Sequence, residues 1–553
     1  MMGLMLGKLP APKLDRRAFL MASLGALAVR PLPAWAAYAP DIRLLNRLTF
    51  GATPALRADL ARLGAAGWLE AQLALPAENP DLAARLTAAR LRIEYDADSD
   101  GPGRNWPAMN ELRPLSALSA DPASLLPLLD WDSAMAYPER ARPGNEVIAA
   151  SLIRAVHAPA QLREVMTQFW HDHFNVFAQK NEFVSVFFPG FDSGLRAHAL
   201  GNFRAMLGHV ATAPALLIYL TNDESRASPA TENFARELLE LHTLGAANYR
   251  NGAGGAPPGP DGLAASYSDE DVYEVARAFT GWTVGDGRET AEGATTPETG
   301  RFAYVDGWHD PYQKRILGRA FASHQAPMAD GNAVLDMLAT HPGTARFVCT
   351  KIARRLLADD PPEDLIDRLA TVFLAHSSAP DQIAEVIRAL VADPAFDAPP
   401  TKMRRPFEWL VAILRTTGAE VAATDLGWTH QLARAGWMQH AFPPPTGHPD
   451  RAEDWSSGIV LLRMVDMALY AQQDWMGIAG TPPGARVPPG LSTVGAMADH
   501  WGNLMTGQPL DLSFAPKEGL DPSWDAPTDA DGLNEVSTLL IAAAALSPQF
   551  LYR

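Results

Sequence analysis

Apolar residues recur along this chain with the 3.6-residue period of an α-helix. The clearest stripe begins at Leu162 and occupies positions 162, 165, 166, 169, 170, 174 and 177. Helical spacing also covers residues 55–73, 231–244, 269–280, 332–339, 344–357, 362–375, 380–392 and 455–472. The alternation typical of strands is scarce, with residues 302–305 as one short candidate. The pattern therefore predicts an all-α fold with little β structure.

Local start and stop signals support these helices. Ser268 precedes Asp271 by three residues, which is the spacing of an N-terminal capping box. Gly245 and Gly281 each follow a predicted helix, where a glycine can adopt the left-handed conformation of a C-terminal cap. We therefore expect a positive φ at Gly281, before Trp282 packs back against the helix.

Four irregular segments rich in Gly, Pro, Ala and Asp interrupt the helical pattern. They lie near residues 96–143, 251–266, 286–299 and 479–531. None of them looks like a linker between two independent hydrophobic cores. We therefore expect residues 37–553 to form a single large multi-helix domain with long Pro/Gly-rich loop insertions.

The first 36 residues have the organisation of an export signal. The string RRAFL at 16–20 leads into a short apolar run, and a small-residue cleavage pattern ends near Ala36. The paired arginines before Phe-Leu look like a twin-arginine signal, and an ordinary secretory signal is the alternative. The apolar run has about half of the ~20 residues that a membrane span requires. We expect a soluble periplasmic or secreted protein with no transmembrane anchor after signal cleavage.

The charge and cysteine content exclude several classes of protein. The formal net charge is −17, and without the first 36 residues 41 basic side chains face 62 acidic ones, or −21. Such a body repels phosphate backbones, so nucleic acid is not an expected partner. The only cysteine, Cys349, excludes an intrachain disulfide and a cysteine-based zinc cluster.

Two histidines fall on the apolar faces of predicted helices. In FWHDHFNV (169–176), His173 lies about 20° from Leu162 on a helical wheel, whereas His171 lies at about 180°. A helix therefore separates the His-x-His pair, and only a strand would place both rings on one side. In TENFARELLELHTLG (231–245), His242 lies in the middle of the apolar stripe and Glu237 lies at its edge.

A buried imidazole requires partners for both ring nitrogens, and two hypotheses supply them. In the first, His173 and His242 are core histidines bonded to a carbonyl or carboxylate. In the second, His173, Glu237, His242 and His309 gather in a polar pocket that performs acid–base chemistry or binds a divalent metal. Metal ligands would then come from His173, His242 and Glu237. The basic turn KMRRP (402–406) is a further candidate for a cleft.

Several strings occur in a fixed order along the chain: RLTFGATP (47–54), FWHDHFNV, TENFARELLELHTLG, YSDEDVYEVARAFTGWTV (267–284), His309-Asp310 with Lys314, and the terminal LSPQFLYR (546–553). With these strings the chain resembles the DUF1800 family of large exported bacterial proteins of unknown function. The resemblance extends over nearly the whole mature chain. Positions that match the family pattern are Trp170, His173, Asn175, Asn233, Arg236, Glu237, Leu241, His242, Thr243, Gly245, Arg277, Gly281, Trp282, His309 and Lys314.

The resemblance implies an uncharacterised exported protein and names no reaction. It implies that Asn175, Asn233, Arg236, Arg277, Trp282 and Lys314 bind or support the site. Members often occur beside a second uncharacterised family, DUF1501, which looks like an alkaline-phosphatase or sulfatase relative.

Two hypotheses about function follow from these observations. One is a hydrolase-like or metal-dependent enzyme, and the other is a non-enzymatic accessory or scaffold protein with a DUF1501 partner. The chain departs from the family pattern at His171 and at His448 in PPPTGHP (443–449). If the second segment closes over a site, the specificity of that site would differ in this chain.

Overall fold

The computed structural model describes residues 40–77, 79–99, 104–250, 262–290, 293–470, 482–512 and 520–553. The predicted signal peptide and most of the predicted loop at 251–266 lie outside these residues. Within the described part of the chain, no helix is long and apolar enough to cross a membrane.

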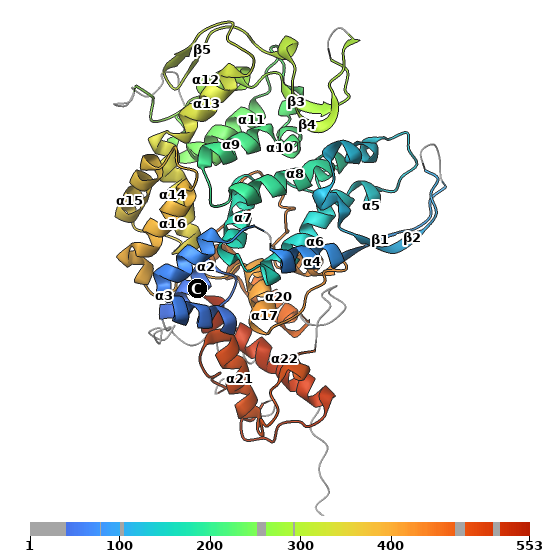
Figure 1. Cartoon of the computed structure of the whole chain (residues 1–553), viewed down its shortest axis with the longest axis vertical. Helices are drawn as coiled ribbons and strands as arrows, with labels where there is room; N and C mark the ends of the chain where they lie inside the picture. Colours follow the sequence, from blue (N-terminus) through green and yellow to red (C-terminus); the bar gives the residue numbers. More distant parts are fainter. Residues whose placement is uncertain are drawn as a thin grey trace, which may run out of the picture.

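Helices form most of the described structure (Figure 1). The first half of the chain contains α2 (Pro40–Leu48), α3 (Pro54–Ala74), α4 (Pro80–Ala88), α5 (Tyr137–Arg140), α6 (Arg142–His157), α7 (Gln161–His173), α8 (Glu182–His198), α9 (Phe203–Thr212), α10 (Pro214–Tyr219), α11 (Glu232–Glu237) and α12 (Asp269–Ala278). The second half contains α13 (Ala329–Ala339), α14 (Pro342–Leu356), α15 (Glu363–Ala375), α16 (Gln382–Ala392), α17 (Pro406–Thr416), α18 (Gly427–Arg434), α19 (Ala452–Trp455), α20 (Gly458–Tyr470), α21 (Val494–Thr506), α22 (Ala530–Ala545) and α23 (Pro548–Leu551).

The described strands form three antiparallel pairs. They are β1 (Arg90–Tyr95) with β2 (Met109–Pro114), β3 (Trp282–Asp286) with β4 (Glu298–Tyr304), and β5 (Lys314–Ile316) with β6 (Arg319–Phe321). The predicted strand at 302–305 corresponds to the end of β4. The prediction of a mostly α-helical fold with little β structure is confirmed.

Helices α7 and α8 lie at the centre of the molecule (Figure 1). Helices α14 to α16 lie on one side of them, and the two ends of the molecule carry α12–α13 with β5 and α21–α22. The N-terminal α2 lies beside the C-terminus, where Arg553 Nη1 donates a hydrogen bond to the carbonyl of Arg47 at 3.1 Å. One cluster of buried apolar side chains extends from Ile42 to Leu551.

The predicted apolar stripe of α7 is confirmed, but the opposite face of this helix is buried as well. Leu162 and Trp170 are fully buried, while His171 and Gln168 on the other side are only 4% and 6% exposed. Because α7 is enclosed by other elements, its polar residues must find partners inside the protein.

Two predicted local signals are present. Ser268 and Asp271 form the capping box at the start of α12. Gly281 has a φ of +82°, and a Cβ at this position would lie 2.7 Å from the carbonyl oxygen of Val305. The positive φ expected at Gly281 is therefore confirmed.

The structure differs from the sequence-based expectations in several segments. The helices that lie outside every predicted helical range are α2, α4, α5, α6, α8, α9, α10, α17, α18, α21, α22 and α23. The expected loop near 96–143 contains β2, two short 3₁₀ helices and α5, and α21 lies within the expected loop near 479–531. The helix expected over 231–244 changes at Leu238 into the π-helical segment η4 (Leu238–Thr243).

Candidate active site

His173 ends α7 inside a cage of aromatic rings. It is 1% exposed and contacts Trp170 and Phe174 edge-on, with ring centroids 5.4 and 4.5 Å away. Its Nε2–H donates to the carbonyl oxygen of His242 at 3.1 Å, whereas Nδ1 has no hydrogen-bond partner among the described residues. Burial, followed by the nearby Lys351 charge, lowers the pKa of His173 well below its usual value. The ring is therefore neutral, with an unused lone pair on Nδ1.

His242 lies next to His173 and is 1% exposed, so its burial agrees with its place on the apolar face of the predicted helix. Its ring centroid is 6.3 Å from that of His173 and 5.1 Å from that of Phe174. Neither ring nitrogen has a hydrogen-bond partner in the described structure. Burial lowers the pKa of His242 to about 3, so this ring is also neutral. The carbonyl of His242, rather than its ring, fixes the tautomer of His173.

A cavity of about 240 Å³ lies beside the end of α7. It is bounded by Phe169 and His173, by α14, by Arg405 and by the segment from Thr446 to Asp454. Its basic lining residues are Lys351, Arg354, Arg355, Arg405 and Arg451, and its acidic ones are Asp172, Asp450 and Asp454. We refer to this space as the α7–α14 cavity.

Asp172 connects three walls of the cavity. Its Oδ2 pairs with Arg405 Nη1 at 2.8 Å, and its Oδ1 accepts from His448 Nδ1 at 3.1 Å. Burial alone would raise the pKa of Asp172, but Arg405 and His448 outweigh this effect and hold that pKa well below its usual value. His448 stacks on Trp437 at 3.9 Å, and its Nε2 accepts from the backbone N–H of Met438. Both nitrogens of His448 are thus engaged, so its role is to position the segment.

Arg405 has a donor group that the protein does not use. Its Nε pairs with Glu408 at 2.7 Å and its Nη1 pairs with Asp172, but Nη2 is buried without a hydrogen-bond partner among the described residues. The guanidinium lies over the Trp437 ring at 4.7 Å, which fixes its plane. Arg405 is 1% exposed, so the orientation of its free N–H groups is set by the fold.

Lys351 contributes an ammonium group without an ion-pair partner among the described residues. Its Nζ lies 5.4 Å from the centre of the Phe347 ring. Burial lowers the pKa of Lys351 to about 8, and the charges of Asp172 and Asp450 partly oppose this effect. Arg354, one turn further along α14, donates its Nε–H to the carbonyl of Asp359 and has no carboxylate partner in the described structure. The cavity therefore contains positive charge that the protein itself does not neutralise.

Residues 442–448 are held in place by α7 and its extension. Asn175 donates hydrogen bonds to the carbonyls of Phe442 and Pro444, at 2.9 and 2.8 Å. Gly447 has a φ of +71°, and a Cβ there would lie 2.0 Å from the carbonyl oxygen of Asp172. The segment PPPTGHP, noted in the sequence for its departure from the family pattern, therefore closes one side of the cavity.

His309 belongs to a different cluster. Its Nδ1 lies 3.0 Å from the carbonyl of Thr280, and its Nε2 lies 3.5 Å from Asp330. Lys314 pairs with the same Asp330 at 2.6 Å. Arg277 pairs with Asp310 through Nε at 2.8 Å. These contacts join α12, β5 and α13. They engage the side chains of His309, Lys314 and Arg277, which the sequence indicates as candidates for catalysis or for support of the site.

The remaining predicted site residues lie outside the lining of the α7–α14 cavity. Glu237 is partly buried on α11, and burial, with the charge of Glu240, raises its pKa to about 7. Asn233 donates to the carbonyl of Leu220, and Arg236 pairs with Glu232 and Asp269. Trp282 is 1% exposed and packs against Phe279 and Phe302.

Of the four candidate catalytic residues, the structure brings His173 and His242 together. Among the described residues, no three His, Cys, Asp or Glu side chains are grouped so that they could hold a metal ion. The set His173, His242 and Glu237 is thus not assembled as a ligand set. Sequence reasoning missed Lys351 and Arg354, although Arg405 lies in the KMRRP turn that it singled out. Lys402 of that turn is buried and pairs with Asp359 and Asp450 at 2.8 and 2.9 Å.

Comparison with known proteins identifies the family of this chain. No curated protein and no solved structure matches it. A family model described as a protein of unknown function, DUF1800, matches residues 43–552, so the chain belongs to the DUF1800 family.

Proposed function

We propose that this protein is exported by the twin-arginine route and that the α7–α14 cavity binds an anionic substrate and hydrolyses it by acid–base chemistry. The observation that carries the proposal is the positive charge of this cavity that has no ion-pair partner in the described part of the chain. Lys351 and the Nη2 group of Arg405 face no carboxylate partner of their own among the described residues. Buried donors without partners are costly unless a ligand satisfies them.

The basic groups divide into a fixed set and an available set. Arg355 and Arg405 are matched by Glu408 and Asp172, which keeps them in place. Lys351 and Arg354 have no such match within the described structure, and Arg405 retains free N–H groups. Convergent N–H donors of this kind bind carboxylate, phosphate or sulfate groups.

In this proposal the neutral His173 acts as the general base and the protonated Lys351 acts as the general acid. The neutral His173 has a free Nδ1, which accepts a proton from a water molecule as the oxygen of that water bonds to the substrate. Lys351, still protonated at pH 7 and with a pKa of about 8, gives a proton to the leaving oxygen as its bond breaks. Burial is the main cause of the lowered pKa of His173, and a bound anion would offset the smaller contribution of the Lys351 charge.

Anion binding is tested by calorimetric titration of inorganic phosphate into the full chain. We expect Lys351→Met to weaken binding at least tenfold, because it removes a partly buried ammonium group that lines the cavity. Binding by the unsubstituted protein should weaken as the pH rises through about 8, where Lys351 loses its proton. Lys180→Met is the matched control, since Lys180 is exposed and lies outside the cavity lining.

The chemical step is tested with nitrophenyl esters of phosphate, sulfate and carboxylic acids. His173→Gln keeps a donor for the His242 carbonyl but removes the lone pair of Nδ1, so it should retain phosphate binding and lose turnover. Turnover that survives in His173→Gln would refute the role of His173. Phosphate binding without turnover of any ester would favour a non-enzymatic binding protein, and no binding at all would favour the scaffold hypothesis.

A further inference from the structure

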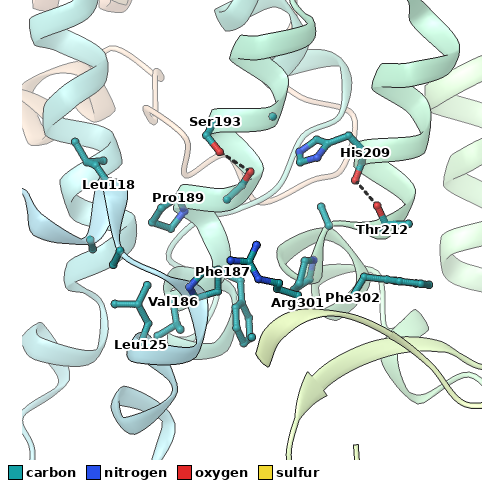
Figure 2. A pocket seen from close by; sticks show the side chains of 18 of the residues that line it. Leu118, Leu125, Val186, Phe187, Pro189, Ser193, His209, Thr212, Arg301 and Phe302 are labelled. Carbon is teal, nitrogen blue, oxygen red and sulfur yellow. Dashed lines mark hydrogen bonds between the residues drawn. The ribbon is translucent and has the colours of Figure 1, made fainter. Parts of the chain in front are cut away.

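A second cavity, of about 540 Å³, lies against α8 and shares no lining residue with the α7–α14 cavity. Figure 2 shows it between Leu118, Leu125 and Val186 on one side and His209 and Thr212 on the other. Its walls come from the 3₁₀ helices η1 (Ser116–Ser119) and η2 (Pro122–Leu129), from α8, from the α9–α10 junction and from β4. The volume lies within the range of small-molecule binding sites.

The face of α8 that lines this cavity contains residues that a helix does not favour. Pro189, Gly190 and Gly194 all lie within α8 and all line the cavity. Gly194 has a packing reason, because its Cβ would overlap the ring of His209. Gly190 has none, since a Cβ there would meet nothing within 4 Å. Glycine and proline are the residues least compatible with a helix interior, so their cost at this face calls for a functional reason.

The polar groups of the cavity offer acceptors. Ser193 donates its hydroxyl hydrogen to the carbonyl of Gly190 at 3.0 Å (Figure 2). The hydroxyl of Thr212 lies 2.9 Å from the carbonyl of Gly208 and 3.2 Å from that of His209, and Figure 2 draws the second contact. His209 donates Nε2–H to the carbonyl of Phe191 at 3.4 Å, which leaves Nδ1 as a lone pair without a partner among the described residues. Burial lowers the pKa of His209, so the ring is neutral. Arg301, at the rim, is paired with Asp121 at 2.9 Å.

We infer that this cavity binds an uncharged, mainly apolar molecule that carries a hydroxyl group. The apolar walls accommodate its body, the open space beside Gly190 admits it close to the α8 backbone, and its hydroxyl donates to Nδ1 of His209. An anion would gain nothing inside, because the rim ion pair is already neutral and the remaining polar atoms only accept, and a cation would find no carboxylate among the lining residues. This inference is independent of the proposed anion site.

The test is a calorimetric titration of three naphthalene probes into the full chain. 2-Naphthol has the apolar body and one hydroxyl donor, 2-methoxynaphthalene lacks the donor, and 2-naphthoate is an anion. We expect 2-naphthol to bind about fivefold more tightly than 2-methoxynaphthalene, the contribution of one hydrogen bond. Equal binding of these two probes, or no binding of either, would overturn the inference.

Two variants locate the binding. Gly190→Leu fills the open space, so it should weaken 2-naphthol binding at least tenfold without lowering the melting temperature. Gly458→Leu is the matched control, because a Cβ at Gly458 also meets nothing within 4 Å and lies outside the cavity. His209→Phe keeps the ring but removes Nδ1, so it should abolish the preference for 2-naphthol over 2-methoxynaphthalene.

Comparing 2-naphthoate with 2-naphthol in the same variants tests whether the ligand is uncharged. An anion can also enter the α7–α14 cavity. We therefore assign to the second cavity only the 2-naphthoate binding that Gly190→Leu removes. Tighter binding of 2-naphthoate than of 2-naphthol by this criterion would mean that Arg301 selects an acid, and would refute an uncharged ligand. Unchanged 2-naphthol binding in Gly190→Leu would equally refute the site.

Discussion

The two neighbouring histidines of the candidate site show how the surroundings of a single ring decide its role. His173 has one nitrogen bonded to a carbonyl and one left available, which is the arrangement of a base with a fixed tautomer. His242 has neither nitrogen bonded within the described structure. A buried polar group without a partner costs about 1–3 kcal/mol, so His242 is not retained for its contribution to stability through hydrogen bonding.

Substitutions of His242 separate packing from polarity. His242→Ala should lower the free energy of unfolding by about 2–4 kcal/mol, because it leaves a cavity between Phe174 and His173. His242→Leu fills most of that space and removes two unsatisfied nitrogens, so it should cost far less or even stabilise the protein. Chemical denaturation of both variants measures the difference. A loss in His242→Leu as large as that in His242→Ala would show that the ring makes a polar interaction in solution.

The sequence predicts part of this site and leaves the rest hidden for a physical reason. Helical phase placed His173 and His242 in the core because both lie on strongly apolar faces. Lys351 and Arg354 look like ordinary solvated charges of an amphipathic helix, and only the fold shows that they line a cavity together with the distant Thr446–Asp454 segment. His309 looked equally suitable in the sequence, but long-range packing places it against Asp330. Pairings between distant segments carry no periodic signal.

At the level of elements, the same limit explains which helices were missed. Helix α8 contains Pro189 and Gly190, and both residues argue against a helix locally. Tertiary packing overrides this preference because α8 contacts α6, α7, α9 and α10. The π-helical segment η4 adds a residue to its turn, so a uniform 100° step is wrong there, yet His242 is still buried. Burial was predicted correctly in a region where the helix type was not.

The docking of residues 442–448 on α7 depends on Gly447. A side chain at this position would require a strained φ of +71° and would overlap the Asp172 carbonyl. Gly447→Ala should therefore lower the free energy of unfolding by about 1–3 kcal/mol and weaken phosphate binding. Gly418→Ala is a suitable control, because Gly418 has a similar φ of +69° but a Cβ added there would meet nothing within 4 Å. Equal effects of the two substitutions on phosphate binding would contradict the role of this contact.

Over the whole molecule, a buried ion network joins segments that are far apart in the sequence. Glu408 at the start of α17 pairs with Arg355, Arg405 and Arg553, and Arg405 pairs with Asp172. The C-terminal residue is thereby fixed to the same cluster that frames the candidate site. Removing one member of such a network leaves an uncompensated buried charge, which costs about 3–5 kcal/mol. Segments from the middle and the end of the sequence therefore hold the cluster that frames the candidate site.

This network predicts how stability responds to acid. Burial alone would raise the pKa of Glu408, but Arg355, Arg405 and Arg553 outweigh it and hold that pKa well below its usual range, as Arg405 and His448 do for Asp172. Carboxylates with a lowered folded-state pKa stabilise the protein above their unfolded values near 4, and this stabilisation is lost as the pH falls below them.

The melting temperature should therefore fall steeply below about pH 4. Glu408→Gln should be less stable at pH 7 and should show a smaller further loss between pH 5 and pH 3. Because these charges are buried, 0.5 M NaCl should leave the difference between the two proteins largely unchanged, whereas exposed pairs such as Arg346–Asp367 would be screened. Calorimetry from pH 7 to pH 3 measures the melting temperatures of the unsubstituted protein and of Glu408→Gln. Parallel melting curves for the two proteins across this range would show that the network does not control acid unfolding.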